Sequence, residues 1–145
     1  MKIRADEHIA PKIVRAVRDL VLSSTHELSH VREYHSARTA DETWVPRFAL
    51  EGGKAILSAD RHMLARPHQQ AAVLASGVSC IILPPQWAQS RRHEQAAHIL
   101  WWWPRIEACL EATEDPRFWK VPFGFDKSKL EEISVRPAIV RAEVR

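Results

Sequence analysis

Three clusters of acidic side chains are the part of this sequence best suited to chemistry. They are Asp6-Glu7, Asp41-Glu42 and Asp60. The first and third each follow a short apolar run typical of a buried β-strand, whereas the second opens a segment with helical spacing. Carboxylates that meet at one edge of a sheet repel one another, unless a hard divalent cation such as Mg²⁺ or Mn²⁺ binds them. The pattern therefore predicts a metal-dependent phosphodiesterase.

One or two such ions would orient a water molecule, lower its pKa and neutralise charge on a phosphodiester. The carboxylates are metal ligands in this chemistry and not nucleophiles. The sequence has no Ser-His-Asp order, no phosphate-cradling glycine loop and no GxGxxG, so it gives no support to a nucleophilic hydrolase or a nucleotide kinase.

Each acidic cluster also has a purely structural explanation. Asp6 and Asp60 are each able to cap the turn that follows a strand, because Asp is a favoured cap residue. Thr39 and Glu42 have the spacing of a capping box, in which the Glu42 carboxylate bonds back to the Thr39 backbone. Asp41 and Glu42 therefore remain alternatives for one ligand position.

Length and composition are those of a single globular domain. The chain has 145 residues, of which 46% are hydrophobic, enough to form a proper core. No apolar run reaches the roughly 20 residues that cross a bilayer, and the first residues lack a secretory signal pattern, so we expect a cytoplasmic protein. The net charge of +3 suits a polyanionic partner without establishing one.

Cysteine and histidine spacing gives no support to a zinc site. Cys80 and Cys109 lie far apart in apolar surroundings and form no CxxC pair, so we expect both to be buried, reduced thiols. His26 and His30 have a helical spacing that suits a metal, but no third ligand lies at a convincing offset in the sequence. We therefore expect these histidines to lie at the surface or to be hydrogen-bonded within the protein.

Short apolar runs alternate with segments of helical spacing along the chain. Strands are expected near residues 2–5, 24–31, 54–60, 78–83 and 118–123, and helices near residues 11–21, 39–51, 68–76 and 91–114. This alternation predicts an α/β fold in which helices cover both faces of a parallel sheet.

Three prolines bear on these elements. Pro46 is tolerated only if it falls in or near the first turn of its helix. Pro104 is expected to kink or split the last helix. Pro122 cannot donate to a central ladder, so residues 118–123 are predicted to form an edge strand.

The last part of the chain and three consecutive tryptophans suggest a partner. We assign residues 1–125 to the domain and residues 126–145, which are charged and without a clear period, to a tail that we expect to dock on a partner subunit. Trp103 falls on the apolar stripe of the last helix, and Trp101 points roughly opposite it. Part of the indole surface of Trp101 and Trp102 is therefore expected to meet another chain or the tail, as in a homodimer or a partner-binding groove.

The acidic clusters and their neighbours also resemble a known family. Residues 6–11 (DEHIAP), 40–44 (ADETW) and 56–64 (ILSADRHML) occur in the order and spacing of PIN-like proteins. The likeness is to VapC-type toxin nucleases and to the short DENLSP-type PIN-like domains, and it covers about residues 1–125.

This resemblance implies a fold, an activity and partners. The fold is a three-layer α/β/α sandwich with a mainly parallel sheet of four to five strands. The activity is cleavage of RNA at an acidic pocket that binds Mg²⁺ or Mn²⁺, often as the toxin of a toxin–antitoxin pair, with a cognate antitoxin as protein partner. The resemblance assigns the metal-binding and catalytic roles to Asp6, Asp41 or Glu42, and Asp60, with Glu7 and Ser58 as secondary candidates.

Two positions depart from the family pattern. Relatives often have Asn at the position of His8 and a second acid at the position of His62. The loss of that acid favours a single-ion site, or a weak or inactive one. His62 is instead a candidate for contacting phosphate or acting as a general acid, because histidine titrates near neutral pH.

Basic residues supply candidates for RNA contacts. Lys12, Arg15 and Arg18 form one face of the first expected helix, which either follows a phosphate backbone or is a solvated surface. Lys12, Arg15 and Arg61 are the RNA-binding candidates. The preferred interpretation is a metal-dependent endoribonuclease; a catalytically silent PIN-like module that binds RNA or protein is the alternative, and a DNA-directed nuclease is a third.

Overall fold

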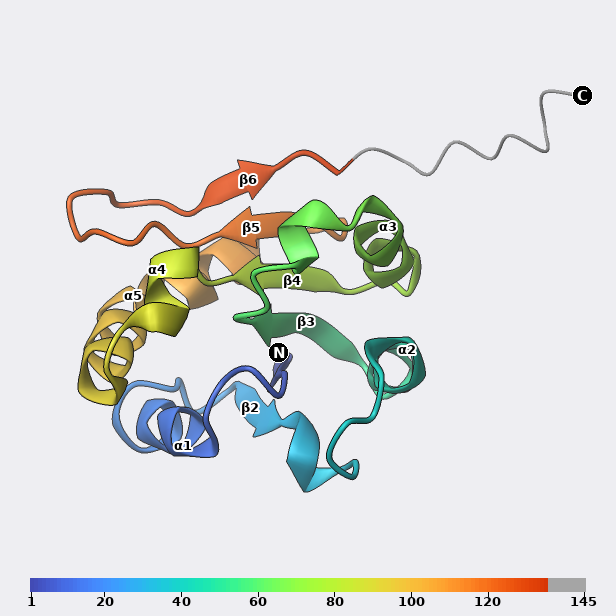
Figure 1. Ribbon diagram of the computed structural model, residues 1–145, viewed down its shortest axis with the longest axis horizontal. Helices are drawn as coiled ribbons and strands as arrows, with labels where there is room; N and C mark the ends of the chain where they lie inside the picture. The colour runs from blue at the N-terminus through green and yellow to red at the C-terminus, as the bar shows by residue number, and fades with distance from the viewer. Residues whose placement is uncertain (136–145) are drawn as a thin grey trace, which may run out of the picture.

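A six-stranded sheet forms the middle layer of the computed structural model, which describes residues 1–135 of the chain (Figure 1). The strands are β1 (Lys2–Ala5), β2 (Glu27–His30), β3 (Gly53–Ser58), β4 (Ser79–Ile82), β5 (Phe118–Lys120) and β6 (Glu131–Ile133). Their spatial order is β2-β1-β3-β4-β5-β6. The first five run parallel, and β6 pairs antiparallel with β5.

Helices cover both faces of this sheet, as Figure 1 shows. The longer helices are α1 (Pro11–Leu20), α2 (Asp41–Leu50), α3 (Pro67–Ala75) and α5 (Arg92–Ala112); short α4 (Pro85–Gln89) follows β4, and 3₁₀ turns lie at η1 (Val31–Glu33) and η2 (Met63–Ala65). Helices α1 and α5 pack on one face of the sheet and α2 and α3 on the other. The predicted α/β/α sandwich is therefore confirmed, with one strand more than expected.

The alternation of side chains along the strands explains why the sheet is buried on both faces. In β3, Ala55 and Leu57 join the core beneath α1 and α5, whereas Ile56 joins the core beneath α2. Successive side chains of a strand point to opposite faces, and a parallel sheet covered on both sides needs apolar residues at nearly every position. The run Ala-Ile-Leu of β3 satisfies this requirement.

The end of the chain differs from the predicted edge strand. Pro122 lies beyond the end of β5, and β6 pairs along β5 through Phe118–Ile133 and Lys120–Glu131. Residues 118–123 are therefore not an edge strand, and the prediction was wrong because β6 carries no periodic apolar pattern. Strand β6 comes from the segment expected to form a tail; residues 136–145 lie outside the described part of the chain.

The structure accommodates a proline in each of α2 and α5. Pro46 is the sixth residue of α2 and lies in its second turn, next to the first turn near which it was expected. Helix α5 continues through Pro104 without a break, so the expected split is absent. The fully buried side chains Trp102, Trp103 and Ile106 lie on either side of Pro104, and this packing holds the helix together where one hydrogen bond is lost.

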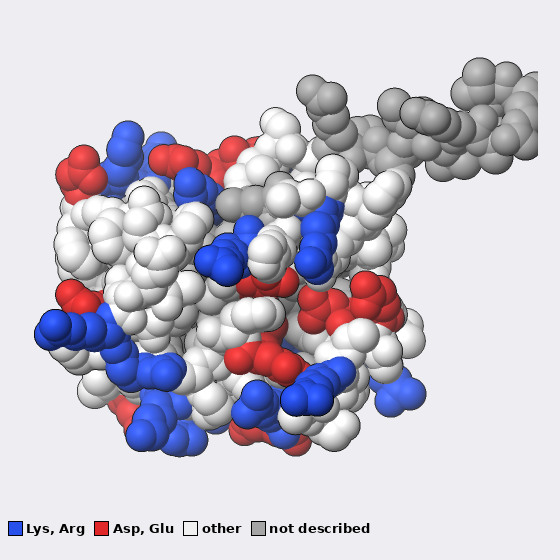
Figure 2. Space-filling view, viewed as in Figure 1, with Lys and Arg blue, Asp and Glu red and all other residues white. Residues whose placement is uncertain are grey.

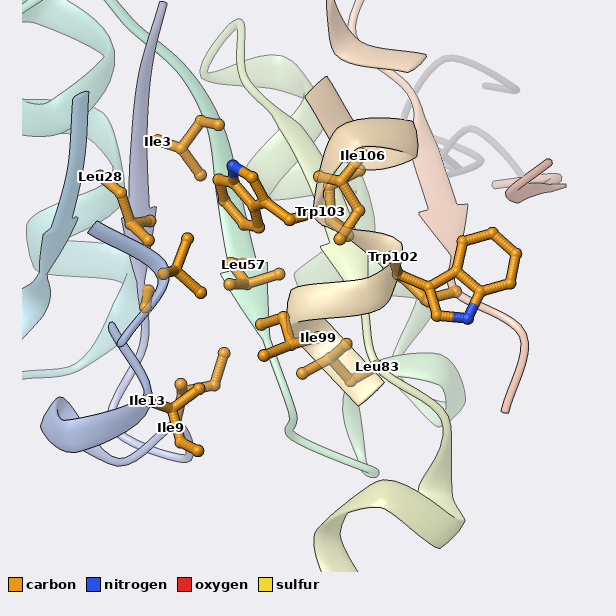
Figure 3. Packing of buried hydrophobic residues seen from close by; sticks show 14 of the residues in the cluster. Ile3, Ile9, Ile13, Leu28, Leu57, Leu83, Ile99, Trp102, Trp103 and Ile106 are labelled. Atoms are coloured by element: carbon orange, nitrogen blue, oxygen red, sulfur yellow. The ribbon is translucent and has the colours of Figure 1, made fainter. Parts of the chain in front are cut away.

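The consecutive tryptophans Trp102 and Trp103 are both fully buried, in different places. Figure 3 shows the Trp103 ring on the side of α5 that faces Ile3 and Leu57, and the Trp102 ring on the other side of the helix. The Trp102 indole N–H donates to the Gly124 carbonyl at 3.1 Å. Trp102 is thus covered by its own chain, in a buried cluster that includes Leu130 from the segment expected to form the tail.

Trp101 and Cys109 keep some solvent exposure. Trp101 is 37% exposed and contacts the Phe125 ring edge-on, with centroids 4.9 Å apart. Cys80 is buried and Cys109 is half-buried, and neither forms a disulfide; burial raises the pKa of both thiols. The reduced state was correctly predicted, whereas complete burial holds for Cys80 alone. No helix in the described part of the chain combines the length and the apolar character that a membrane crossing requires.

The close packing of β3 against α2 gives a test of the fold. A Cβ atom at Gly53 would overlap the ring of Phe48, and overpacking of this kind costs about 1–3 kcal/mol. Gly53→Ala should therefore lower the free energy of unfolding by about this amount in urea denaturation. The loss should shrink when Gly53→Ala is combined with Phe48→Ala; an equal loss in both backgrounds would contradict the packing seen here.

Candidate metal-binding acidic site

The adjacent strands β1 and β3 bring the first and third acidic clusters together. Asp6 directly follows β1 and Asp60 follows β3 by two residues, at the same edge of the sheet. The Asp6 backbone N–H donates to the Leu57 carbonyl at 2.9 Å. In open parallel sheets the carboxyl ends of the strands are the usual location of a ligand.

Ser58 connects these two acids directly. Its hydroxyl donates to the Asp6 carboxylate and accepts from the Asp60 backbone N–H at 3.1 Å. Ser58 is completely buried, and Asp6 and Asp60 are 3% and 9% exposed. A single buried hydroxyl therefore fixes both acidic residues at the edge of the sheet.

The second acidic cluster forms the opposite wall of the same cavity. Asp41 is the first residue of α2 and Glu42 the second. The cavity has a volume of about 350 Å³ and is lined by Asp6, Glu7, His8, Arg38, Thr39, Ala40, Asp41, Glu42, Asp60, Arg66 and Gln69. Figure 2 shows acidic side chains gathered in the middle of this face, with basic side chains around them.

Asp6 and Asp60 also cap the turns that follow them. One oxygen of Asp6 accepts from the His8 backbone N–H at 3.0 Å, and one oxygen of Asp60 accepts from the His62 backbone N–H at 2.9 Å. Helix α1 itself begins later, after Ala10. The capping role predicted as an alternative for Asp6 and Asp60 is therefore confirmed. It is compatible with their position in the cavity because each turn uses a single carboxylate oxygen.

Asp41 is held in place by two neutral donors. Its oxygens accept from the Trp44 indole N–H at 3.0 Å and from the Gln69 amide at 2.9 Å. Burial raises the pKa of Asp41, and the negative charge of Asp6 raises it further, while these two hydrogen bonds oppose the change. The acidic residues of the cavity therefore influence one another through their like charges.

Glu42 does not form the expected capping box. Helix α2 is preceded by Ala40 and has no side-chain cap. The Thr39 hydroxyl and the Thr39 backbone N–H both donate to the Ser36 carbonyl, so the Thr39 backbone is already engaged. Glu42 is exposed and lines the cavity, which leaves its carboxylate available to a ligand.

The secondary candidates lie at different distances from the cavity. Glu7 lines it, and its carboxylate accepts from the Arg38 backbone N–H at 2.6 Å. His62 and Arg61 are exposed, and neither side chain lines the cavity. The backbone at Arg38 has a positive φ of 67°, an uncommon conformation outside glycine.

The basic face of α1 is smaller than expected. Lys12 and Arg15 are exposed, as predicted for a face that meets solvent or a polyanion. Arg18 instead donates to the Leu28 carbonyl at 2.6 Å and pairs with Glu33. Arg18 is thus used to attach α1 to the segment around β2 and does not belong to a free basic surface.

His8 is the residue whose importance sequence reasoning missed. Its Nδ1 lies 3.6 Å from a carboxylate oxygen of Asp6. This contact, with attraction from Asp60 and Asp41, raises the pKa of His8 from 6.5 to about 9 against an opposing effect of burial. The available signal was its spacing two residues after Asp6. Arg38, Arg66 and Gln69 were also missed as cavity residues, since only the fold brings them to the acids.

The donor set fits a hard divalent cation, although the acids are not drawn tightly together. Among the described residues, three potential ligand atoms lie within 4.8 Å of one another in the group His26, Glu107 and Glu111, which is a different part of the molecule. As a set, the carboxylate oxygens of the acidic cavity lie further apart than this. Carboxylates at this spacing suit Mg²⁺ or Mn²⁺, because these ions prefer oxygen ligands, keep several bound waters and need only one or two direct carboxylate ligands.

Comparison with known proteins places the chain in a family. The family model described as a PIN like domain matches residues 1–85, which is more than half of the 145 residues and includes all three acidic clusters. The chain therefore belongs to the PIN-like domain family, whose members are commonly nucleases. No curated protein and no solved structure matches the chain.

The charge of His8 predicts a pH dependence of stability in metal-free protein. Because the folded pKa of about 9 lies above the unfolded value near 6.5, the stabilisation is complete below pH 6.5. It is lost as the pH rises through about 9.

Urea denaturation in EDTA should show this loss for the native chain and not for His8→Gln. His93→Gln, which removes another exposed histidine, is the matched control and should behave as the native chain does. Parallel stability curves for the native chain and His8→Gln between pH 6 and pH 10 would contradict the assignment.

Proposed function

We propose that this protein is an Mg²⁺- or Mn²⁺-dependent endoribonuclease that acts as the toxin of a toxin–antitoxin pair. The observation that supports it best is the convergence of Asp6, Asp60, Asp41 and Glu42 on one cavity at the carboxyl edge of the sheet. Membership of the PIN-like family supports a nuclease in general terms. RNA, the toxin role and the choice of ion rest on the resemblance of the acidic motifs.

The chain's own residues would hold and orient the reactants. Asp6 and Asp60, fixed by Ser58, and Asp41 or Glu42 would bind the ion, with Glu7 as a further ligand. When bound, the ion supplies an activated water and neutralises charge on the phosphodiester. The carboxylates remain ligands throughout. His62, which is exposed outside the cavity lining and bonded through its backbone to Asp60, is the candidate for donating a proton to the leaving oxygen.

Basic side chains would position the RNA backbone around the acidic cavity. Arg38 and Arg66 lie in the cavity wall, where a guanidinium is suited to bind a phosphate in bidentate fashion. Lys12, Arg15 and Arg61 are exposed and would contact phosphates of the RNA further from the cleaved bond. These contacts are independent of base sequence.

A protein partner belongs to the same proposal. We propose a cognate antitoxin and a homodimer as partners, and a subunit interface for residues 126–145. Exposed aromatic surface supports a partner: Trp101, Phe123 and Phe125 are 37%, 47% and 53% exposed. Aromatic side chains are enriched where proteins bind one another.

A catalytically silent PIN-like module is the second candidate, and two observations favour it. The His8 imidazolium lies against Asp6 and so provides the positive charge that an ion would otherwise supply. Both oxygens of Asp41 already accept hydrogen bonds. In this alternative the cavity would be a stable acidic surface next to RNA- or protein-binding residues.

Removal of one carboxylate separates the two candidates. Asp6→Asn and Asp60→Asn should each lower cleavage of a single-stranded RNA at least about 100-fold, because several kcal/mol of charge stabilisation depend on the bound ion. Asp19→Asn, which neutralises an exposed acid on α1, is the control and should cleave normally. A native protein inactive in Mg²⁺ and Mn²⁺ would support the silent module, whereas cleavage that survives both substitutions would contradict the proposed metal site. Faster cleavage of DNA would indicate a DNA-directed enzyme.

Metal binding should also be visible as stability. Addition of Mn²⁺ to EDTA-treated protein should raise the melting temperature by mass-action linkage, since the ion relieves repulsion among the cavity carboxylates. The increase should disappear in Asp6→Asn and persist in Asp19→Asn. A melting temperature that does not change up to millimolar Mn²⁺ would contradict the proposed ion site.

The exposed basic residues predict a loss of affinity without a loss of chemistry. Lys12→Gln, Arg15→Gln and Arg61→Gln should each raise KM for RNA and leave kcat nearly unchanged. Each lost phosphate contact should reduce the magnitude of the negative slope of log K for RNA binding against log salt concentration by about 0.7, the value for single-stranded nucleic acid. Lys54→Gln, which removes a lysine bonded to the Thr113 carbonyl, provides a control distant from the acidic cavity.

A further inference from the structure

A second group of potential metal ligands lies away from the acidic cavity. It consists of His26, Glu107 and Glu111, each of which offers one ligand atom, and these atoms all lie within 4.8 Å of one another. The His26 Nε2 is 3.4 Å from a Glu111 oxygen. His26 was recognised in the sequence as half of a possible metal-binding pair for which no third ligand was found.

The fold supplies the ligands that the sequence spacing did not. Glu107 and Glu111 are one turn apart on α5 and therefore share a helix face. His26 lies in the connection between α1 and β2, directly before Glu27, whose backbone N–H donates to the Met1 carbonyl at 2.8 Å. His30 takes no part, because its ring contacts the Ile9 carbonyl at 2.7 Å and the Arg32 backbone N–H.

The position of this group excludes a role in the acidic cavity. The His26 side chain lies at the amino end of β1 and β2, whereas Asp6 follows the carboxyl end of β1. The five intervening steps of strand correspond to roughly 16 Å at about 3.3 Å per residue. The two groups therefore lie at opposite ends of the central strands.

The Glu107 carboxylate is held rigidly. It accepts hydrogen bonds from the Trp103 indole N–H at 2.8 Å and the Ser23 backbone N–H at 3.0 Å, and also from the Ser23 hydroxyl. Glu107 is 5% exposed, whereas the Glu111 side chain is 56% exposed. Outer donors of this kind fix the orientation of metal-bound carboxylates, and the exposed glutamate gives an ion access from solvent.

The charge of the group is not balanced by a Lys or Arg side chain; the positive charge nearest to it is the Met1 ammonium, which lies 3.0 Å from His26 Nδ1. Within residues 1–135, no Lys or Arg side chain forms an ion pair with Glu107 or Glu111. The contact with His26 is the one ion pair of this group, and it requires a protonated ring. A divalent ion would compensate two carboxylates and would use Nε2 of the neutral ring as its nitrogen ligand, because Nδ1 faces Met1.

We propose that His26, Glu107 and Glu111 bind a divalent transition-metal ion such as Zn²⁺. One imidazole nitrogen and two carboxylates suit Zn²⁺ and its neighbours, whereas the ligands proposed in the cavity of Asp6 and Asp60 are carboxylates. The ion joins the α1–β2 connection to α5 and so stabilises the domain at the end opposite the acidic cavity. This site does not depend on the proposed nuclease activity.

The test uses the full chain with the acidic cavity disabled. The Asp6→Asn, Asp60→Asn double variant, stripped with EDTA, is titrated with Zn²⁺ by calorimetry. One ion per chain should bind, and a hundredfold excess over Kd should raise the melting temperature by about 5–10 °C. Zn²⁺ should also shift the side-chain NMR signals of His26.

Conservative variants assign the ligands. His26→Gln and Glu111→Gln, made in the same background, should each weaken Zn²⁺ binding at least tenfold and abolish the melting-temperature rise. His93→Gln and Glu114→Gln, which change exposed residues outside the group, are the matched controls and should bind like the parent. Glu107 is left intact because its buried carboxylate receives three hydrogen bonds.

Two results would overturn the proposal. One is the absence of Zn²⁺ binding by the double variant, which would show that His26 and Glu111 form an ion pair only. The other is binding that survives both His26→Gln and Glu111→Gln. Neither result bears on the nuclease proposal, which is tested by Mn²⁺ binding and RNA cleavage with the native acidic cavity.

Discussion

The parallel pairing of β1 with β3 is the constraint on which the rest of this structure depends. It sets Ala5 beside Leu57, so the chain leaves both strands at the same edge and delivers Asp6 and Asp60 to one place. The buried hydroxyl of Ser58 then joins the two residues. Without this register Asp6 and Asp60 would only cap their own turns. The cavity wall formed by α2 and the segment before it would then contain no carboxylates from β1 and β3.

Much of the fold could be predicted from the sequence because its signals are local. Apolar runs such as Ile56-Leu57 indicate strands, Pro11 marks the first turn of α1 and Gly77 follows α3. The position of Asp6 and Asp60 followed from one further rule, that ligands gather where parallel strands end. The confirmed sandwich is the product of these two kinds of information.

The failures arise where packing between distant segments overrides a local rule. Helix α5 continues through Pro104 because Trp102 and Trp103 are anchored on different sides of it. Thr39 satisfies its hydrogen bonds at Ser36, so the capping-box spacing with Glu42 is not used. Both outcomes depend on neighbours that no sequence window contains.

The candidate sites show the same division. The acidic residues of the cavity were identifiable because each lies just after a recognisable strand or at the start of a recognisable helix. The positive charge of His8, in contrast, depends on three carboxylates that only the fold assembles. The group of His26, Glu107 and Glu111 joins two segments far apart in the chain. A search limited to short spacings finds the histidine and misses the glutamates.

Strand β6 has a consequence for the solubility of the molecule. It is three residues long, runs against the direction of β5 and carries two exposed glutamates, Glu131 and Glu132. Short, charged outer strands discourage other chains from adding to a sheet by backbone pairing. Strand β6 thereby protects β5 from pairing with other chains. In a chain ending before Leu130, β5 would be an unpaired edge strand that promotes aggregation.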